Sequence, residues 1–334
     1  MMTTDPQRIS TADPASATLD DFRSADPPMM RCLELARVAG QTELPILILG
    51  ESGAGKTLLA RAIHNSSTWA KGPFIAFNAA ALSDTLVDSQ LFGHERGAFT
   101  GAQKAVKGKF ELAHNGTLFI DEIADMSASA QSKILRAVEY GEFERLGSDS
   151  LRKADVRLIS ATHLPLQQLI GAGRFRRDLF YRISGISVTI PPLRARPHDL
   201  PLLIAAEIAA ASRRLKKPIK GLDALATERL ISYPWPGNLR ELSRVIHTAV
   251  ALTPTEIIPA EALLLQESFS AFAVDRELTS PPASFAAAKG NNQDTLEAAE
   301  RQHILRILEQ VGGNKRKAAG ILGISRSTLD RKLV

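Results

Sequence analysis

The sequence has little of several features that mark particular classes of protein. Cys32 is the only cysteine among 334 residues, so no internal disulfide can form, which suits the reducing cytoplasm. Aromatic residues make up only 5% of the chain, and no apolar run reaches the roughly 20 residues that a membrane-spanning helix needs. The N-terminus is polar and lacks the basic start and apolar stretch of a secretory signal. These absences argue against secretion and membrane insertion, and we expect a cytoplasmic protein.

The charges nearly balance over the whole chain but cluster near its C-terminus. The 41 basic and 36 acidic residues leave a net charge of +5, which is too small to indicate a nucleic-acid partner. The basic cluster consists of Lys315, Arg316, Lys317, Arg326, Arg331 and Lys332. Such a cluster is typical of a surface that faces phosphates, although a solvated helix face explains the same charges when they are taken alone.

The length favours one large and one small domain, and composition suggests where they meet. Residues 1–21 are rich in Ser, Thr, Pro and Asp, and we expect them to be a disordered leader. Residues 22–195 alternate short apolar runs with helical stretches, while residues 196–265 show only helical periodicity. Residues 266–293 have the composition of a linker, and residues 294–334 form a compact helical unit.

The alternating pattern predicts an α/β domain in which helices cover both faces of a parallel sheet. The all-helical stretch after it predicts a lid subdomain attached to that sheet. We expect strands at residues 45–49, 74–77, 117–120 and 156–160, with helices at 58–64 and 128–140.

A glycine-rich segment after the first expected strand fits the phosphate-binding loop, or Walker A, pattern. Its members are Gly50, Glu51, Ser52, Gly53, Ala54, Gly55, Lys56 and Thr57. The glycines let backbone N–H groups point at phosphates, Lys56 supplies a point charge to the β- and γ-phosphates, and the Thr57 hydroxyl is a ligand for Mg²⁺. A chance loop of small residues is the alternative, but the strand before the segment and the helix after it favour a site for ATP and Mg²⁺.

A later apolar run ends in two carboxylates. Residues 116–120 read Gly-Thr-Leu-Phe-Ile, and Asp121 and Glu122 follow them. This pattern is typical of a Walker B strand, in which Asp121 holds the metal ion and Glu122 polarises the attacking water. Paired acids at a strand end could instead cap the next helix, but the phosphate-binding loop upstream favours ATP hydrolysis.

A distinctive hexapeptide lies between these two motifs. It consists of Gly97, Ala98, Phe99, Thr100, Gly101 and Ala102. Two glycines around a single Phe allow a loop that changes shape while presenting one large apolar anchor. As an isolated segment, it is more simply explained as a turn whose Phe packs into its own core.

In its place between the Walker motifs, the hexapeptide closely resembles the loop of the sigma-54-interacting AAA+ activators, the bacterial enhancer-binding proteins. The resemblance extends from about Phe22 to the C-terminus. It implies an AAA+ P-loop NTPase fold and a mobile loop that contacts the sigma-54 subunit of RNA polymerase.

The resemblance also implies roles for residues outside the Walker motifs. Asn78 matches the switch asparagine that bonds to the Walker B glutamate, here Glu122. Arg176 and Arg182 match arginine fingers that reach the nucleotide of a neighbouring subunit, so the working enzyme would be an oligomer. Arg240 matches the second sensor, on a helix that Asn238 is expected to cap. Taken alone, each arginine is more simply explained as a solvated surface charge.

The chain departs from the family pattern at two positions. Thr57 stands where the family commonly has an acidic residue, a change that should help Mg²⁺ binding. Thr162 and His163 stand at the first sensor, where the family usually has Thr-Asn. Imidazole still forms hydrogen bonds but is larger and titrates near neutrality, so the role of His163 in coupling is open.

The C-terminal unit has the pattern of a helix-turn-helix. An amphipathic helix is expected over residues 296–311 and a second over 315–322, which Asn314 should cap. Gly323 is expected to make the turn and Ser325 to cap a third helix. The unit resembles the Fis-type domain of the same family, and a three-helix protein-interaction module is the alternative. The residues expected at DNA are Lys315, Arg316, Lys317, Ser325, Arg326, Ser327, Thr328, Arg331 and Lys332.

Together these patterns favour an ATP-hydrolysing activator that binds DNA upstream of sigma-54 promoters and assembles from dimers into a ring, which we expect to be a hexamer. The rival interpretations are an AAA+ DNA-remodelling protein, such as a replication initiator or helicase loader, and a DNA-binding repressor whose AAA+ part only senses nucleotide. About twenty residues precede the motor, too few for a receiver or ligand-sensing domain. We therefore expect control by a separate regulatory protein or by abundance.

Overall fold

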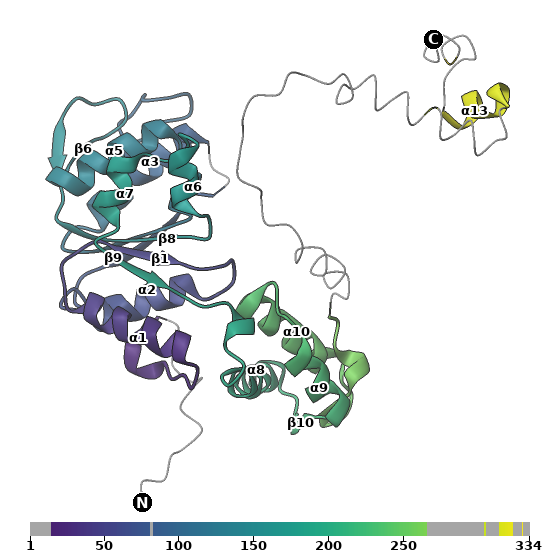
Figure 1. Ribbon diagram of the computed structural model, residues 1–334. Coiled ribbons are helices and arrows are strands. Elements are labelled where there is room, and N and C mark those ends of the chain that lie inside the picture. The colour runs from purple at the N-terminus through teal and green to yellow at the C-terminus, as the bar shows by residue number, and fades with distance from the viewer. Residues whose placement is uncertain (1–14, 81–82, 266–303, 305–313, 323–328, 330–334) are drawn as a thin grey trace, which may run out of the picture. The chain divides into compact units, whose positions relative to one another are not determined.

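The computed structural model describes residues 15–80 and 83–265 and, near the C-terminus, residues 304, 314–322 and 329 (Figure 1). The chain divides into two compact units, Met1–Phe269 and Ser270–Val334. The first unit contains the expected α/β and lid subdomains, and the second contains the expected DNA-binding unit.

A five-stranded parallel sheet forms the centre of the α/β subdomain, in the order β2-β5-β8-β1-β9. The strands are β1 (Ile46–Leu49), β2 (Phe74–Asn78), β5 (Gly116–Asp121), β8 (Val156–Thr162) and β9 (Ile186–Thr189). The first four confirm the expected strands. The fifth, at the edge beside β1, was not predicted.

Helices cover both faces of this sheet, as predicted. Figure 1 shows α1 (Pro27–Gly40) and α2 (Lys56–Asn65) on one face. On the other face lie α3 (Asp84–Phe92), α5 (Ala128–Tyr140), α6 (Leu166–Gly171) and α7 (Arg177–Ile183). Because successive strand residues point to opposite faces, Leu47 belongs to one apolar core while its neighbours Ile46 and Ile48 belong to the other.

The prediction of a disordered leader up to residue 21 is wrong for residues 15–21. A short 3-10 helix, η2 (Leu19–Asp21), follows the first described residues. The Leu19 N–H donates to Ser66 Oγ at 2.9 Å, and Asn65 Nδ2 donates to the Ala17 carbonyl at 2.8 Å. Leu19 is buried in the core beneath α1 and α2, so burial of one apolar side chain holds a segment of polar composition in place.

The lid subdomain packs around its own apolar core, in which Trp235 is fully buried. Its helices are η4 (Leu193–Ala195), α8 (Leu200–Leu215), α9 (Ala224–Ser232), α10 (Asn238–Leu252) and η5 (Ala260–Ala262). The expectation of helices alone needs correcting, because β10 (Gly221–Leu222) pairs in parallel with β11 (Ile257–Ile258). Strands of two residues are too short to show an alternating pattern in sequence.

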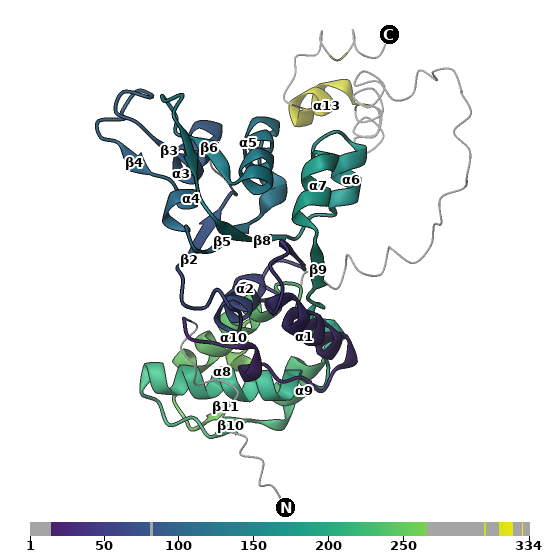
Figure 2. The same ribbon diagram turned by 90° about the vertical axis from the view of Figure 1, so that its left-hand side faces the viewer.

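Two small hairpins extend from the α/β subdomain beside α3 and α5 (Figure 2). The first pairs β3 (Gly93–His94) with β4 (Val106–Lys107), and the short helix α4 (Lys109–Leu112) follows it. The second pairs β6 (Glu142–Glu144) with β7 (Leu151–Lys153). An isolated bridge between His94 and Leu146 joins the two hairpins.

In the C-terminal unit, α13 spans Lys315–Leu322, which confirms the expected helix and its bounds. The Lys317 N–H donates to Asn314 Oδ1 at 3.2 Å, so Asn314 caps this helix as predicted. Ala318, Ala319 and Leu329 are buried. Of the helix expected over residues 296–311, only Ile304 is described, and it is helical and buried. The Gly323 turn and the start of the third helix lie outside the described residues.

Candidate ATP site and polymerase-contacting loop

The phosphate-binding loop connects β1 to α2. Gly53 and Gly55 have φ angles of +75° and +102°, a left-handed conformation that favours glycine. Lys56 opens α2 and is buried, and its Nζ donates to the Gly50 carbonyl at 3.0 Å and to the Glu51 carbonyl at 3.4 Å. The loop therefore has the curled shape that directs backbone N–H groups and one ammonium toward a bound anion.

The Walker B acids lie at the carboxyl end of β5, next to this loop. A cavity of about 220 Å³ is lined by Ser52, Gly53, Gly55, Lys56, Thr57, Leu58, Asp121, Glu122 and Arg240. The structure thus brings both Walker motifs and the second-sensor arginine together. Burial and the neighbouring Glu122 charge raise the pKa of Asp121. A bound cation would offset both effects, which fits a carboxylate that holds a metal ion.

The residues of this cavity also fit Mg²⁺. The Thr57 hydroxyl and the Asp121 carboxylate line the same space, and Mg²⁺ prefers oxygen ligands supplied by one or two protein groups together with substrate phosphates. In the described part of the chain, no group of three or more His, Cys, Asp or Glu residues could hold a metal ion by itself. Thr57 and Asp121 would hold such an ion together with the phosphates of a bound nucleotide.

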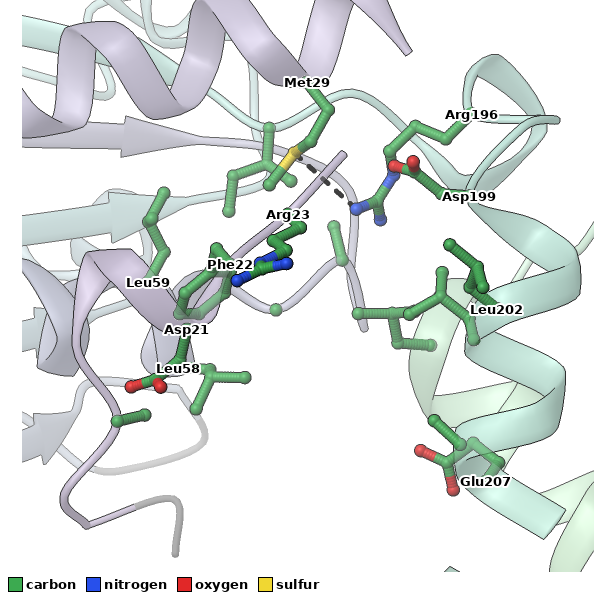
Figure 3. A pocket seen from close by; sticks show the side chains of 17 residues that line it. Asp21, Phe22, Arg23, Met29, Leu58, Leu59, Arg196, Asp199, Leu202 and Glu207 are labelled. Carbon is green, nitrogen blue, oxygen red and sulfur yellow. Dashed lines mark hydrogen bonds between the residues drawn. The ribbon is translucent and has the colours of Figure 1, made fainter. Parts of the chain in front are cut away.

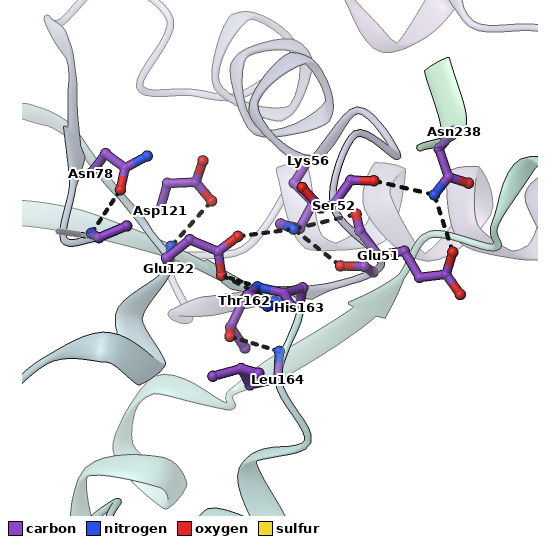
Figure 4. A network of polar contacts seen from close by, with 12 residues as sticks. Glu51, Ser52, Lys56, Asn78, Asp121, Glu122, Thr162, His163, Leu164 and Asn238 are labelled. Atoms are coloured by element: carbon purple, nitrogen blue, oxygen red, sulfur yellow. Dashed lines mark hydrogen bonds and ion pairs between the residues drawn. The ribbon is translucent and has the colours of Figure 1, made fainter. Parts of the chain in front are cut away.

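The carboxylate of Glu122 is held in place by two residues, His163 and Lys56 (Figure 4). One carboxylate oxygen, Oε2, lies 2.7 Å from His163 Nδ1 and accepts a hydrogen bond from the His163 backbone N–H at 3.2 Å. The other, Oε1, forms an ion pair with Lys56 Nζ at 3.4 Å. Burial works to raise the pKa of Glu122, but the hydrogen bonds from His163 and the charge of Lys56 outweigh it and lower the pKa.

The expected hydrogen bond between Asn78 and Glu122 is not formed in the described part of the chain. Asn78 ends β2 in register with Asp121, so it lies at the correct edge of the sheet. However, its Oδ1 accepts a hydrogen bond from the Ala80 N–H at 2.8 Å. The side chain is thus turned back to its own backbone, while Glu122 is bound to His163.

The lid meets the phosphate-binding loop through the start of α10. Arg240 Nη1 donates to Ser52 Oγ at 2.9 Å. The sequence predicted that Asn238 caps α10, and this prediction is wrong. Asn238 is the first helical residue, and Gly237 is the cap. The fully buried Asn238 side chain instead accepts from the Leu193 N–H at 2.7 Å and donates to Glu51 Oε2 at 3.0 Å and to the Ser52 carbonyl at 3.1 Å.

Replacing Asn238 with alanine should therefore destabilise the junction between the lid and the loop. The change removes three hydrogen bonds and leaves the buried Leu193 N–H without its partner, so we expect a loss of about 3 kcal/mol in the free energy of unfolding, measured by urea denaturation. Arg194→Ala is the control, because it removes an exposed ion pair to the same Glu51 and should cost less than about 1 kcal/mol. Equal losses in the two variants would contradict this role of Asn238.

A second cavity of about 380 Å³ adjoins the phosphate-binding loop (Figure 3). Most of its lining is apolar and comes from segments far apart in the chain: residues 17–23, helices α1 and α2, Ile190 directly after β9, and the lid. Phe22, Leu59 and Leu203 are among the lining residues, and Ala54 and Gly55 connect it to the loop. Its size and lining suit a flat purine ring. Sequence reasoning missed this cavity, because no local pattern links the segments that form it.

The Gly97–Ala102 hexapeptide forms the tip of the first hairpin region. The Gly97 N–H donates to the Ala102 carbonyl at 2.8 Å, which closes the loop. The Phe99 ring lies edge-on to the His94 ring, with 5.0 Å between centroids, and is partly exposed. Gly97 and Gly101 have φ angles of +84° and +104° and open space around them. The loop thus presents Phe99 at the surface and does not bury it in the core.

Three known families of protein domains match successive parts of this chain. Residues 22–189 match the sigma-54 interaction domain, residues 194–272 an AAA+ ATPase lid domain, and residues 295–334 the Fis family of bacterial regulatory proteins. The chain belongs to the family of sigma-54-interacting AAA+ regulators. It therefore contains an AAA+ ATPase motor and a Fis-type DNA-binding domain. This assignment favours the regulator over a replication initiator or helicase loader.

Curated relatives of this regulator family include transcriptional regulatory protein ZraR of Escherichia coli, which is 43% identical over 92% of this chain and 67% of its own length. Regulatory protein AtoC of the same organism is 42% identical, over 92% of this chain and 66% of its own. NtrX from Brucella abortus in complex with ATP is a similar solved structure, with a TM-score of 0.66, 33% identity and coverage of 93% of this chain and 68% of its own.

Ion pairs connect the base of the hairpin that carries the Gly97–Ala102 hexapeptide to the second hairpin. Arg145, which is nearly buried, donates to Glu111 Oε1 and Oε2 at 2.7 Å and to Glu95 Oε1 at 2.9 Å. Arg152 of β7 forms further ion pairs with the same two glutamates. Sequence reasoning missed this cluster, since residues 34 to 57 positions apart in the chain meet only in the fold. It makes the two hairpins one connected element.

The two expected arginine fingers lie on the surface of the motor. Arg176 forms a bidentate ion pair with Asp178 and donates to Ser132 Oγ at 3.1 Å. Arg182 donates to the carbonyls of Val138 and Glu139. Within the described residues, neither guanidinium forms a hydrogen bond with the phosphate-binding loop or the Walker B acids of its own chain. This placement is compatible with action on a neighbouring subunit.

The residues expected at DNA are placed only in part. Lys315 and Lys317 lie exposed on α13, and Arg316 is on the same helix. The remaining six, from Ser325 to Lys332, lie outside the described residues. In the part of the chain that the structure describes, no helix has the length and apolar character required to cross a membrane.

Proposed function

We propose that this protein activates sigma-54-dependent transcription by coupling ATP hydrolysis to movement of the loop around Phe99. The observation that carries the proposal is the short connection between the two sites. The chain runs from Asn78 at the ATP edge of the sheet through α3 directly into the hairpin that bears the hexapeptide. A change at the strand ends is therefore transmitted to the loop through one helix.

The site residues would divide the chemistry between them. Lys56 and Arg240 would bind the phosphates, and the 380 Å³ cavity would take the base. Mg²⁺ bound by Thr57 and Asp121 would neutralise charge on the β- and γ-phosphates. Glu122 would accept a proton from the attacking water, and its contact with Lys56 would give way when Lys56 turns to the phosphates.

The motor would act as a ring assembled from dimers, with a hexamer as the proposed form. The exposed Arg176 and Arg182 support this arrangement, because a charge supplied by a neighbour would make hydrolysis depend on assembly. The C-terminal domain would bind double-stranded DNA upstream of the promoter through its basic residues. A protein with these partners would act in the cytoplasm, which is the location that we propose.

Binding of the purified protein to sigma-54 tests the proposal. We expect a complex with ADP plus aluminium fluoride, which mimics the hydrolytic transition state, and none with ADP alone. The Gly97–Ala102 loop is the contact that should respond to nucleotide. No complex in either condition, with ATPase activity intact, would instead favour a DNA-remodelling protein.

Phe99→Ala should separate hydrolysis from activation. Phe99 packs against His94 and is not among the residues that line the ATP cavity, so steady-state ATPase activity should stay within about twofold of wild type. Open-complex formation should fall to background, since a central aromatic anchor contributes more than about 2 kcal/mol at a protein interface. Val106→Ala, at an exposed position on the same hairpin, should retain activation. Retained activation in Phe99→Ala would rule out the loop assignment.

A further inference from the structure

The side-chain amide of Gln131 joins two backbone segments of the motor that lie far apart in the chain. Gln131 is fully buried on α5, which lies beside α7 (Figure 2). Its Nε2 group donates to the Met126 carbonyl at 2.8 Å and to the Arg174 carbonyl at 3.1 Å. Its Oε1 atom accepts a hydrogen bond from the Arg176 N–H at 2.8 Å. Both donors and the acceptor of this amide are therefore bonded to backbone groups.

Two of these bonds fix the backbone that carries Arg176, one of the two expected arginine fingers. Phe175, between Arg174 and Arg176, is buried in the core of the α/β subdomain. The Arg176 carbonyl accepts from the Phe180 N–H at 3.1 Å in the first turn of α7. The Arg176 side chain, in contrast, is 44% exposed. The base of this side chain is thus fixed in the fold, whereas its guanidinium is accessible to a neighbouring subunit.

We propose that Gln131 is a positioning residue, which sets where the guanidinium of Arg176 meets the ATP site of a neighbouring subunit. The inference rests on the proposed action of Arg176 on that neighbour. The third bond of the amide runs to Met126, which directly follows the short helix after Glu122. The same side chain therefore fixes Arg176 relative to the Walker B segment of its own chain. One buried amide thus connects the ATP site of each subunit to the arginine that serves the next.

Burial makes Gln131 a stronger constraint on Arg176 than the contacts of the guanidinium itself. The guanidinium bonds to Asp178 and to Ser132 Oγ, but these contacts are exposed, and exposed ion pairs contribute little. Loss of the Gln131 amide would leave the backbone groups that it binds without these partners, and unpaired groups of this kind are costly where they are buried. The segment would then shift toward other partners, and Arg176 would move with it.

Gln131→Met keeps the approximate volume of the side chain and removes all three bonds. We expect kcat for ATP to fall about 10- to 100-fold, because a misplacement of about 1 Å in a reacting geometry costs up to about 10² in rate. Gln131 is not among the residues that line the ATP cavity, so the affinity of the single chain for ATP should stay within about twofold. Ser132→Ala, at an exposed position, and Ile134→Val, at a buried position of the same helix, are the controls and should lower kcat less than about threefold.

Mixed assemblies distinguish this role from damage to the chain's own ATP site. Lys56→Ala chains supply the arginine but no working site, whereas Arg176→Ala chains supply the site but no arginine. Adding Gln131→Met to the Lys56→Ala chain should lower the activity restored by mixing about tenfold or more, and adding it to the Arg176→Ala chain should change that activity less than about twofold. Gln131→Asn, which keeps the amide but is one carbon shorter, should show the same asymmetry.

The measurement is steady-state ATP hydrolysis by full-length chains, with thermal unfolding and size-exclusion chromatography as checks that each variant folds and assembles. Equal loss in both placements, or loss only in the chain that supplies the site, would overturn the inference and leave Gln131 a structural role. Absence of restored activity when Gln131 is intact in both chains would instead overturn the proposed action of Arg176 on a neighbour. The two failures are therefore distinguishable.

Discussion

Glu122→Gln should stop ATP turnover while leaving ATP binding intact. The substitution keeps the length and shape of the side chain but removes the proton acceptor, and loss of a positioned general base typically lowers the rate by a factor of about 10² to 10⁴. It also removes the ion pair to Lys56, which frees that ammonium for the phosphates. Binding of ATP should therefore be unchanged or tighter. Isothermal titration with ATP measures the affinity, and a steady-state phosphate-release assay measures the rate of turnover.

The control for this variant is Asp125→Asn. Asp125 lies in the short helix η3 (Ile123–Asp125) directly after Glu122, is exposed, and does not line the ATP cavity. The Asp125→Asn variant should therefore hydrolyse ATP at the wild-type rate. If Glu122→Gln retained more than about a tenth of wild-type turnover, another group would have to activate the water, and the assignment of Glu122 would be wrong.

Arg176→Ala and Arg182→Ala should each lower ATP hydrolysis by a factor on the order of 10³, with ATP binding by the single chain preserved. An arginine supplied by a neighbour is worth about 10³ to 10⁵ in rate in other nucleotide hydrolases. Both side chains are exposed and bond only to residues remote from the phosphate-binding loop in the described structure. Arg177→Ala, at an exposed position in the same segment, should have little effect.

Mixing two inactive variants shows whether these arginines act between subunits. Lys56→Ala chains lack a working phosphate site but keep both arginines, whereas Arg176→Ala chains keep the phosphate site. If the arginine acts in trans, the mixture should regain ATPase activity that neither variant has alone. Two variants that remain inactive in every ratio, although they still assemble together, would show that Arg176 acts within its own chain.

The sequence pattern was sufficient where a motif is local. The phosphate-binding loop, the Walker B strand and the Asn314 cap each depend on residues that are neighbours in the chain, and each has the expected secondary structure. The strands β1, β2, β5 and β8 were also predictable, because apolar runs bounded by turn residues mark them. Because the carboxyl ends of parallel strands meet at one edge of a sheet, Lys56, Asp121 and Glu122 could be expected in one cavity.

The sequence pattern was insufficient where a side chain has a choice of partners. Asn238 has the composition of a helix cap, yet it bonds to Glu51 and Ser52, residues almost two hundred positions away. Asn78 was expected at Glu122, but that carboxylate is bound to His163. The packing of the lid and the order of the strands decide which partner each side chain bonds to.

By itself, then, the sequence determined the fold class, the ATPase motifs and the family, because these depend on short patterns that specify backbone conformation and charge. The tertiary structure decided how Glu122 is oriented, where the lid meets the phosphate-binding loop, and which segments enclose the 380 Å³ cavity. These features join residues from distant parts of the chain. Their geometry follows from burial of the apolar cores, which sets distances that no local pattern records.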